Sequence, residues 1–341
     1  VGIVPGEAVA QACEFSLRVR RVHIHEEEVR KLDGDEAAFA VVLGQAGKTA
    51  AGQRAAGSHT AALAASDWAQ PLGMSWQQWM AESASLMGVD AVVNALSEDP
   101  QAIADGAQRL FEAAKAHPGL RIVHLGSMVV YGAASGVVDE SSPLTAELGA
   151  YAAAKLAADA LARACPNAVC LRPSAEYGAG SRPWSEDLGR LLLAGRLGDL
   201  GAAGFGQCNV VHVDDVVQAI VAALRMPMAA GKVYNLSAPG PLSWNDYLRA
   251  YGRALGLARV PVIGPLRWKL ERLLAPLLKV VEIIGGKLGL RTPPLVSPSL
   301  ARLFSQTIRL DSQLAERELG IVWTPLERGL AEAAAPLREK R

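Results

Sequence analysis

The chain has 341 residues, of which 50% are hydrophobic and 20% are charged, so it can form a substantial core and wholesale disorder is excluded. Its 34 basic residues equal its 34 acidic residues, whereas a nucleic-acid-binding protein normally carries a basic excess. The four cysteines show no Cys-x-x-Cys spacing, and no uncharged run reaches the roughly 18–20 residues of a membrane span. We therefore expect a cytoplasmic protein with reduced thiols, built as one large α/β unit or two modest domains, with no nucleic-acid partner.

Residues 1–36 form an N-terminal extension to which the sequence assigns no role. Residues 15–24 alternate between apolar and polar, which predicts a strand with basic side chains on one face. His23 and His25 lie on the same side of this strand, and imidazoles are metal ligands. No third ligand follows from the spacing, so an exposed charged strand explains the pattern and no metal site is predicted.

A glycine-containing turn follows the first predicted buried strand, at residues 39–43. It leads into an Ala-rich run, to about Ala65, that favours a helix. Glycines at a strand-to-helix turn let the backbone approach a pyrophosphate and direct the N–H groups of the helix N-terminus at it. We predict that this turn binds a dinucleotide, with a plain turn without ligand as the alternative. Its cofactor-binding residues are Gly44, Gln45, Ala46, Gly47, Lys48 and Thr49.

The next predicted strand, at residues 71–75, leaves the choice between NAD and NADP open. In a dinucleotide-binding fold, an acidic residue at the end of this strand holds the ribose 2′-OH, whereas an arginine accommodates a 2′-phosphate. The chain offers neither at residues 75–78. About fifteen residues then precede the next apolar strand, which leaves room for one helix.

The stretch from residue 122 to residue 155 carries the candidate chemistry. An apolar strand at residues 122–125 is followed by Ser127, a polar loop and a helix that begins near Tyr151. Tyr151 and Lys155 are four residues apart, so they lie on one face of this helix, one turn apart. An ammonium beside a phenol favours the phenolate and lowers the phenol pKa from about 10. Such a phenol can exchange a proton with a substrate oxygen that the Ser127 hydroxyl could hold.

Apolar runs and capping residues predict the remaining elements. Residues 210–216 are interpreted as a strand followed by an Asp N-cap and an apolar helix, with His212 as a packed core histidine rather than a catalyst. Ser243 is predicted to cap a helix that ends at Gly256. The other predicted elements are helices at residues 99–116 and 151–164 and strands at residues 91–94, 168–171, 233–236 and 307–311.

Residues 266–290 are strongly apolar but carry seven charged side chains, which excludes an ordinary membrane span. We interpret them as a helix packed in a small domain or as a dimer contact. An apolar lid over the substrate, or an amphipathic helix at a membrane interface, is the alternative.

Several of these patterns together resemble one known family. Ser127-Met-Val-Val-Tyr131-Gly132 followed by Tyr151-x-x-x-Lys155 is similar to the extended branch of the short-chain dehydrogenase/reductase superfamily. This branch includes NAD-dependent epimerases and dehydratases and 3β-hydroxysteroid dehydrogenase-like enzymes. The segment from Arg172 to Gly180 resembles the family's loop against the nicotinamide, although Glu176 replaces a usually apolar residue.

The resemblance covers roughly residues 38–335 and is thinnest from residue 48 to residue 88. The family normally places a helix, a strand and another helix where this chain has room for one helix. One strand of the sheet is therefore expected to be lost or replaced, for instance by residues 15–24.

The resemblance implies a Rossmann-type doubly wound parallel sheet with a smaller C-terminal substrate domain. The dinucleotide-binding domain would comprise residues 37–172 and 207–236. The substrate-binding domain would comprise residues 173–206 and 237–335.

The resemblance also implies an enzyme that uses NAD or NADP on a secondary alcohol or ketone. Tyr151 would act as acid and base, Lys155 would lower its pKa and hold the nicotinamide ribose, and Ser127 would orient the substrate oxygen during hydride transfer. Net oxidation or reduction, and the transient oxidation of an epimerase or dehydratase, both stay open. The apolar segment 266–290 favours a lipid-like or polycyclic alcohol over a nucleotide sugar. The remaining cofactor-binding residues are Asn94, Ala95, Leu96, Tyr151, Lys155 and Pro173.

The alternative is a non-catalytic or cofactor-degenerate relative that serves as a binding or regulatory module. The missing strand and Glu176 favour it, whereas the joint presence of Ser127, Tyr151 and Lys155 favours the enzyme. The expected partner is a small-molecule substrate, and the resemblance implies a homodimer through the helices that contain Tyr151 and Glu112. No membrane span is expected, and weak contact with a membrane interface is left open.

Overall fold

The computed structural model describes residues 39–43, 63–64, 91–97, 99–271, 273, 296 and 298–339. Within these ranges, six parallel strands form one sheet in the order β2-β1-β3-β4-β6-β9. Five of them confirm strands predicted from apolar runs. The strands are β1 (Phe39–Leu43), β2 (Leu63–Ala64), β3 (Ala91–Ala95), β4 (Arg121–Leu125), β6 (Ala168–Pro173) and β9 (Val233–Leu236).

The strand order reverses at β1, because β2 lies on one side of it and β3 on the other. In open parallel sheets, ligands bind outside the carboxyl ends of the strands at such a reversal. The carboxyl end of β1 leads into the predicted cofactor turn at residues 44–49, which lies outside the described residues. The carboxyl end of β3 leads to Leu96. This topology confirms the predicted Rossmann-type doubly wound sheet.

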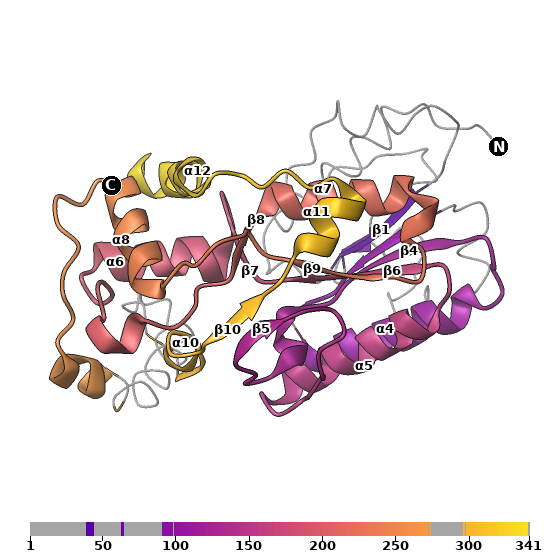
Figure 1. The fold of residues 1–341 in the computed structure, drawn as a ribbon, viewed down its shortest axis with the longest axis horizontal. Helices are drawn as coiled ribbons and strands as arrows, with labels where there is room; N and C mark the ends of the chain where they lie inside the picture. The colour runs from indigo at the N-terminus through magenta and orange to yellow at the C-terminus, as the bar shows by residue number, and fades with distance from the viewer. Residues whose placement is uncertain are drawn as a thin grey trace.

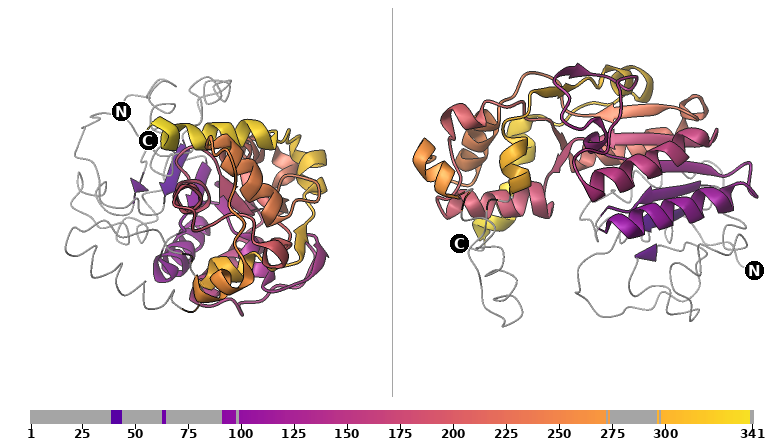
Figure 2. Two further views of the ribbon diagram at one scale, coloured as in Figure 1. Left: turned by 90° about the vertical axis from the view of Figure 1, so that its left-hand side faces the viewer. Right: turned by 90° about the horizontal axis from the view of Figure 1, so that it is seen from below.

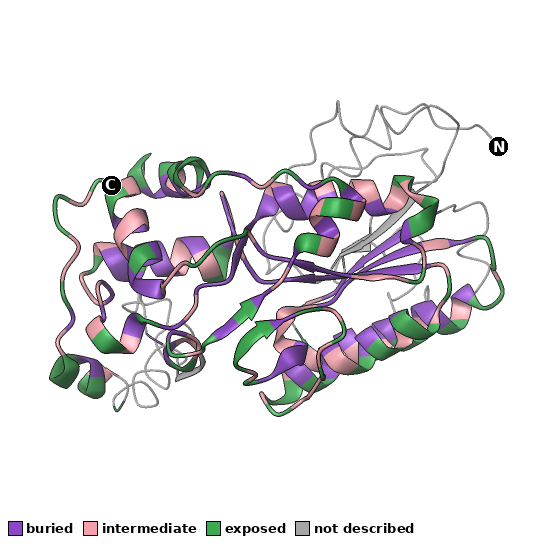
Figure 3. Ribbon diagram, in the orientation of Figure 1, coloured by how far each residue is buried: buried purple, intermediate pink, exposed green. Residues whose placement is uncertain are grey.

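Helices cover both faces of the sheet (Figure 1). α4 (Pro100–Ala114) and α5 (Ala150–Ala164) pack on one face, and α7 (Val213–Arg225) and α11 (Gln313–Leu319) pack on the other. Successive strand residues point to opposite faces, so Ile122 of β4 packs with α4 and α5. Apart from the first residues of β4 and β9, the residues of β3, β4, β6 and β9 are buried, which explains why these strands read as mostly apolar runs (Figure 3).

A second core lies beside the sheet and comes from the second half of the chain (Figure 2). It buries large aromatic side chains, including Trp244, Tyr247 and Phe304. Ser243 caps α8, as predicted, in a capping box with Asp246. The helices of this core are α6 (Leu188–Leu193), α8 (Trp244–Ala254), α10 (Pro298–Leu303) and α12 (Leu326–Glu339).

Two small parallel sheets lie outside the main sheet among the described residues. β5 (Gly136–Val138) pairs with β10 (Ile308–Leu310), and β7 (Ala175–Tyr177) pairs with β8 (Val210–His212). Neighbouring residues of β8 pack into different cores. Val210 packs in the second core, and Val211 packs against the main sheet.

Two predicted segments contain strands that the sequence did not indicate. The Ala-rich run predicted as a helix to about Ala65 ends in β2, which pairs with β1, and residues 50–62 of the run lie outside the described residues. The segment after Arg172, predicted as a loop, contains β7, because Ala175 pairs in register with Val210. The predicted strands at residues 15–24 and 71–75 lie outside the described residues. Across the described ranges, no helix is both long and apolar enough to cross a bilayer.

Candidate active site

Ser127 lies at the carboxyl edge of the sheet, two residues after β4. It is half-buried and caps the 3-10 helix η3 (Met128–Tyr131), where its Oγ accepts a hydrogen bond from the backbone N–H of Val129 at 3.3 Å. A hydroxyl that accepts from the backbone keeps its proton as a donor, since a hydroxyl offers one O–H and two lone pairs. The cap therefore fixes Ser127 at the strand end and leaves a donor for a ligand oxygen.

Lys155 joins α5 to the carboxyl ends of two strands. Its side chain is 1% exposed, and its Nζ donates to the carbonyl oxygens of Leu96 and Leu125, both at 2.8 Å. Burying an ammonium costs free energy unless its N–H groups are hydrogen-bonded, and these carbonyls meet that need. The Nζ lies 6.0 Å from the ring centroid of Tyr151, which is half-buried one helical turn before it. The predicted Tyr-Lys pair is thus held beside the ends of β3 and β4.

The predicted cofactor-binding residues that the structure describes lie at the same edge of the sheet. Asn94 and Ala95 end β3 and are buried, and the Asn94 Oδ1 accepts from the backbone N–H of Leu96 at 3.3 Å. This bond turns the chain just after the strand. Pro173 ends β6, two strands away in the sheet. The carbonyl oxygen of Leu96 accepts a hydrogen bond from Lys155. The predicted cofactor-binding residues 44–49 lie outside the described residues.

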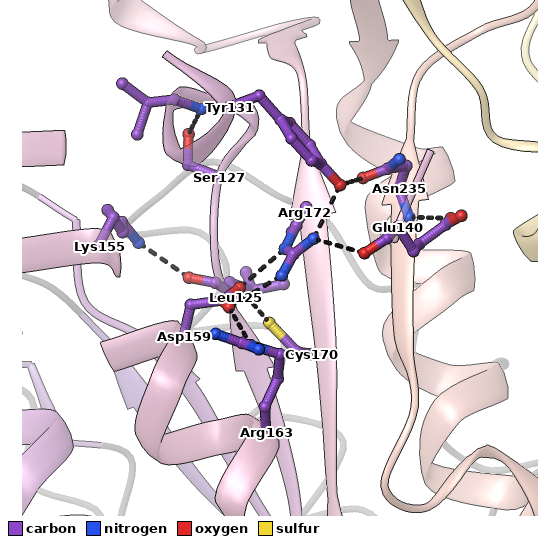
Figure 4. Close-up of polar contacts among 11 residues, drawn as sticks. Leu125, Ser127, Tyr131, Glu140, Lys155, Asp159, Arg163, Cys170, Arg172 and Asn235 are labelled. Atoms are coloured by element: carbon purple, nitrogen blue, oxygen red, sulfur yellow. Dashed lines mark hydrogen bonds and ion pairs between the residues drawn. The ribbon is translucent and has the colours of Figure 1, made fainter. Parts of the chain in front are cut away.

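A buried ion pair that the sequence reasoning missed lies next to these residues (Figure 4). Asp159 is 0% exposed and Arg172 is 1% exposed, and the guanidinium donates to both carboxylate oxygens at 2.8 and 2.9 Å. Burial alone would raise the pKa of Asp159, but the hydrogen bond and charge of Arg172 outweigh it and hold the pKa below its usual value. The sequence signal for this ion pair was the position of Asp159, four residues after Lys155, which puts both side chains on one face of the helix.

Arg172 also organises the loop after Ser127. Its Nη1 donates to the hydroxyl of Tyr131 at 2.8 Å, and that hydroxyl donates to the side-chain oxygen of Asn235 at 2.7 Å (Figure 4). Burial raises the pKa of Tyr131, so this phenol stays protonated and acts as a hydrogen-bond donor. The Arg172 side chain is thus committed to contacts inside the protein. The predicted contact of its segment with a nicotinamide therefore rests on Pro173 and the residues after it.

His212 ends β8 and caps α7, because its Nδ1 accepts a hydrogen bond from the backbone N–H of Asp214 at 3.3 Å. The predicted Asp N-cap was wrong, since the imidazole reaches this amide from the position before the helix. The prediction of a packed histidine is confirmed, at 2% exposed. His212, Asp214 and Glu332 are close enough to hold a metal ion. Nδ1 accepts the capping hydrogen bond, and Nε2 lies 3.5 Å from a carboxylate oxygen of Glu332. The cluster links β8 to α12, with His212 serving as the helix cap.

The fold and this edge define a dinucleotide-binding α/β protein of the short-chain dehydrogenase type. The model of the NAD dependent epimerase/dehydratase family matches residues 54–237, more than half of the chain, and the chain belongs to this family. The match includes Ser127, Tyr151 and Lys155 and begins after the glycine turn.

Two relatives illustrate the similarity in sequence. Protein YeeZ of Escherichia coli K12 is 31% identical over 179 residues, which is 51% of this chain and 62% of that protein. The 3beta-hydroxysteroid-dehydrogenase/decarboxylase isoform 1 of Arabidopsis thaliana is 27% identical over 231 residues, 62% of this chain and 51% of that protein. The chain therefore spans less than two thirds of the length of these relatives.

Solved structures share the fold at low identity. A putative epimerase from Burkholderia cenocepacia J2315 superposes with a TM-score of 0.61 and 17% identity over 96% of both chains. The UDP-glucuronic acid 4-epimerase from Bacillus cereus, in complex with UDP-glucuronic acid and NAD, superposes with a TM-score of 0.55 and 20% identity over 76% of this chain and 78% of that one. These likenesses establish the fold.

Proposed function

We propose that this chain is an NAD- or NADP-dependent oxidoreductase or epimerase/dehydratase that acts on a secondary alcohol or ketone. The observation that carries the proposal is the position of Lys155. Its ammonium is buried at the carboxyl edge of the sheet, bonded to the ends of β3 and β4, and one helical turn from Tyr151. This edge lies beside the reversal in strand order, where dinucleotides bind in folds of this kind.

The residues at this edge fit a nicotinamide cofactor. A buried cation at a ligand-binding edge suits the hydroxyl groups of a ribose, and the buried residues at the end of β3 lie beside it. Lys155, Asn94, Ala95, Leu96 and Pro173 would hold the nicotinamide end. The turn at residues 44–49 would hold the pyrophosphate. The bound nicotinamide would supply or accept the hydride.

The protein's own part in the reaction is proton transfer and orientation. Lys155 favours the phenolate of Tyr151, so this oxygen would take a proton from a substrate hydroxyl or return it to a carbonyl. Ser127 would donate to the same substrate oxygen. The second core, which we assign to the substrate-binding domain at residues 173–206 and 237–335, would bind the rest of the substrate. Residues 37–172 and 207–236 would form the cofactor domain.

Two measurements test the proposal, and titration of the purified protein with NADH and NADPH comes first. Binding of either one supports a cofactor site, and the preferred nucleotide identifies the 2′ group. A folded protein that binds neither would favour the non-catalytic alternative.

The second measurement is turnover of the Tyr151→Phe variant on a secondary alcohol found by screening. We expect turnover to fall about 10²–10⁴-fold with cofactor binding retained, because this variant removes only the acid/base group. The matched control is Tyr234→Phe, which removes a buried hydroxyl bonded to Glu318 at 2.7 Å. Equal turnover in both variants would refute the role of Tyr151.

A further inference from the structure

The helical turns at residues 265–271 direct an apolar face at solvent. Leu266 is 73% exposed, Leu270 is 47% exposed, and Leu273, just beyond, is 70% exposed. Their spacing of four and three residues places them within an arc of about 60° on one side of the helix. We call these three residues the leucine stripe. A stripe of this kind on a surface helix normally faces the core of its own protein.

The opposite side of the same helix is fixed to the protein. Trp268 is 6% exposed, and its ring lies 6.0 Å from that of Phe304 in the second core. Glu271 accepts a hydrogen bond from the Nε of Arg196 at 3.2 Å. Because Trp268 and Glu271 anchor the helix from behind, the outward direction of the leucine stripe is set by packing.

Positive charge flanks the leucine stripe. Arg267 and Lys269 are exposed, and at 100° per residue they fall on either side of it. The acidic side chain of this helix, Glu271, is paired with Arg196, so the exposed charges beside the stripe are both basic. Basic residues beside an apolar face are typical of a helix that lies in a membrane interface.

We propose that the leucine stripe docks this protein on the surface of an anionic lipid bilayer. The leucines would enter the boundary between headgroups and acyl chains, while Lys269 would contact lipid phosphates, as would the Arg267 donors that its hydrogen bond to the carbonyl of Gly195 leaves over. In a symmetric dimer built on this patch, the stripes of two copies could meet, but the flanking cations of both copies would be brought together and repel. Charge complementarity therefore selects a lipid surface. This binding is independent of the proposed chemistry at Tyr151.

Sedimentation of the full chain with vesicles tests the proposal. One set of vesicles contains phosphatidylcholine alone, and the other contains equal parts of phosphatidylcholine and phosphatidylglycerol. We expect binding to the anionic vesicles that weakens with added salt. The double variant Leu266→Ser/Leu270→Ser should bind at least about tenfold more weakly, and Lys269→Gln about fivefold more weakly.

The matched control is Val322→Ser, which removes an isolated apolar side chain that is 75% exposed outside the stripe. It should bind vesicles like the wild type, and circular dichroism should confirm that all variants fold. Equal binding to neutral vesicles, or binding that the leucine substitutions leave unchanged, would overturn the proposal. So would a wild type that sediments with neither set, or leucine substitutions that change only the oligomeric state.

Discussion

His124 makes the folded protein sensitive to acid. It lies on β4 and is 1% exposed, and neither ring nitrogen has a hydrogen-bond partner among the described residues. The ring packs edge-on against Phe111 with centroids 6.1 Å apart. Burial and the charge of Lys155 lower the pKa of His124 from 6.5 to about 3, against the opposing effect of Asp159. The imidazole is therefore neutral in the folded state at any moderate pH.

The sign of the effect follows from the two pKa values. In the unfolded chain the imidazole binds a proton below a pKa of about 6.5, whereas in the folded chain it does so only below about 3. As the pH falls between these values, the unfolded state gains a proton that the folded state cannot bind, so the free energy of unfolding decreases. One pKa unit corresponds to about 1.4 kcal/mol, so the loss is about 2–3 kcal/mol at about pH 4.5 and about 4 kcal/mol near pH 3.

Denaturant unfolding of wild type, His124→Leu and His124→Asn at about pH 7.5 and about pH 4.5 measures this loss. We expect the wild type to lose about 2–3 kcal/mol more stability between the two pH values than either variant, whatever their absolute stabilities. Phe111→Leu is the control, since it loosens the same packing but keeps the imidazole, and it should keep the wild-type pH dependence. Equal pH dependence in the wild type and both His124 variants would refute the argument.

Two further substitutions test contacts that hold the residues around the candidate site in place. Asp159→Asn should lower the free energy of unfolding by about 3–5 kcal/mol, because it leaves the buried charge of Arg172 unpaired. The control Arg163→Gln removes the half-exposed partner of the same carboxylate and should cost less than about 1 kcal/mol; equal losses would contradict this account. Gly132→Ala should destabilise by more than Gly136→Ala, since both have positive φ, at 62° and 79°, but only at Gly132 would the added Cβ clash with a neighbour, the side chain of Thr145. Thermal unfolding measures both, and the reverse order would refute the steric argument.

Much of the sheet could be predicted because its strands are buried on both faces. Ile122, Val123 and Leu125 put apolar side chains on both sides of β4, and the structure places this strand between β3 and β6 in the middle of the sheet. The pairing of β5 with β10 could not be predicted. Three residues of each strand pair across about 170 positions of sequence, and strands this short carry no pattern that identifies a partner.

The candidate site was predicted in part. Ser127, Tyr151 and Lys155 follow from helix spacing and strand order, and their chemical roles remain predictions. The acceptors of the Lys155 ammonium are backbone carbonyls, which every residue offers, so the sequence could not identify them. Asp159 was missed because a carboxylate on a helix usually faces solvent.

The face of α5 that meets the sheet links the candidate chemistry to the stability of the fold. Tyr151, Lys155, Asp159 and Arg163 recur every four residues, so one helical stripe passes from the proposed acid/base group to the buried ion pair. The ion pair between Asp159 and Arg172 joins α5 to β6, and Lys155 lies one turn earlier on the same stripe. Arg172 and Arg163 offset the charge of Asp159, while burial first, and then the charge of Lys155, lower the pKa of His124. A field of that sign disfavours nearby cations and favours nearby anions, which is the condition that a phenolate at the start of this helix requires.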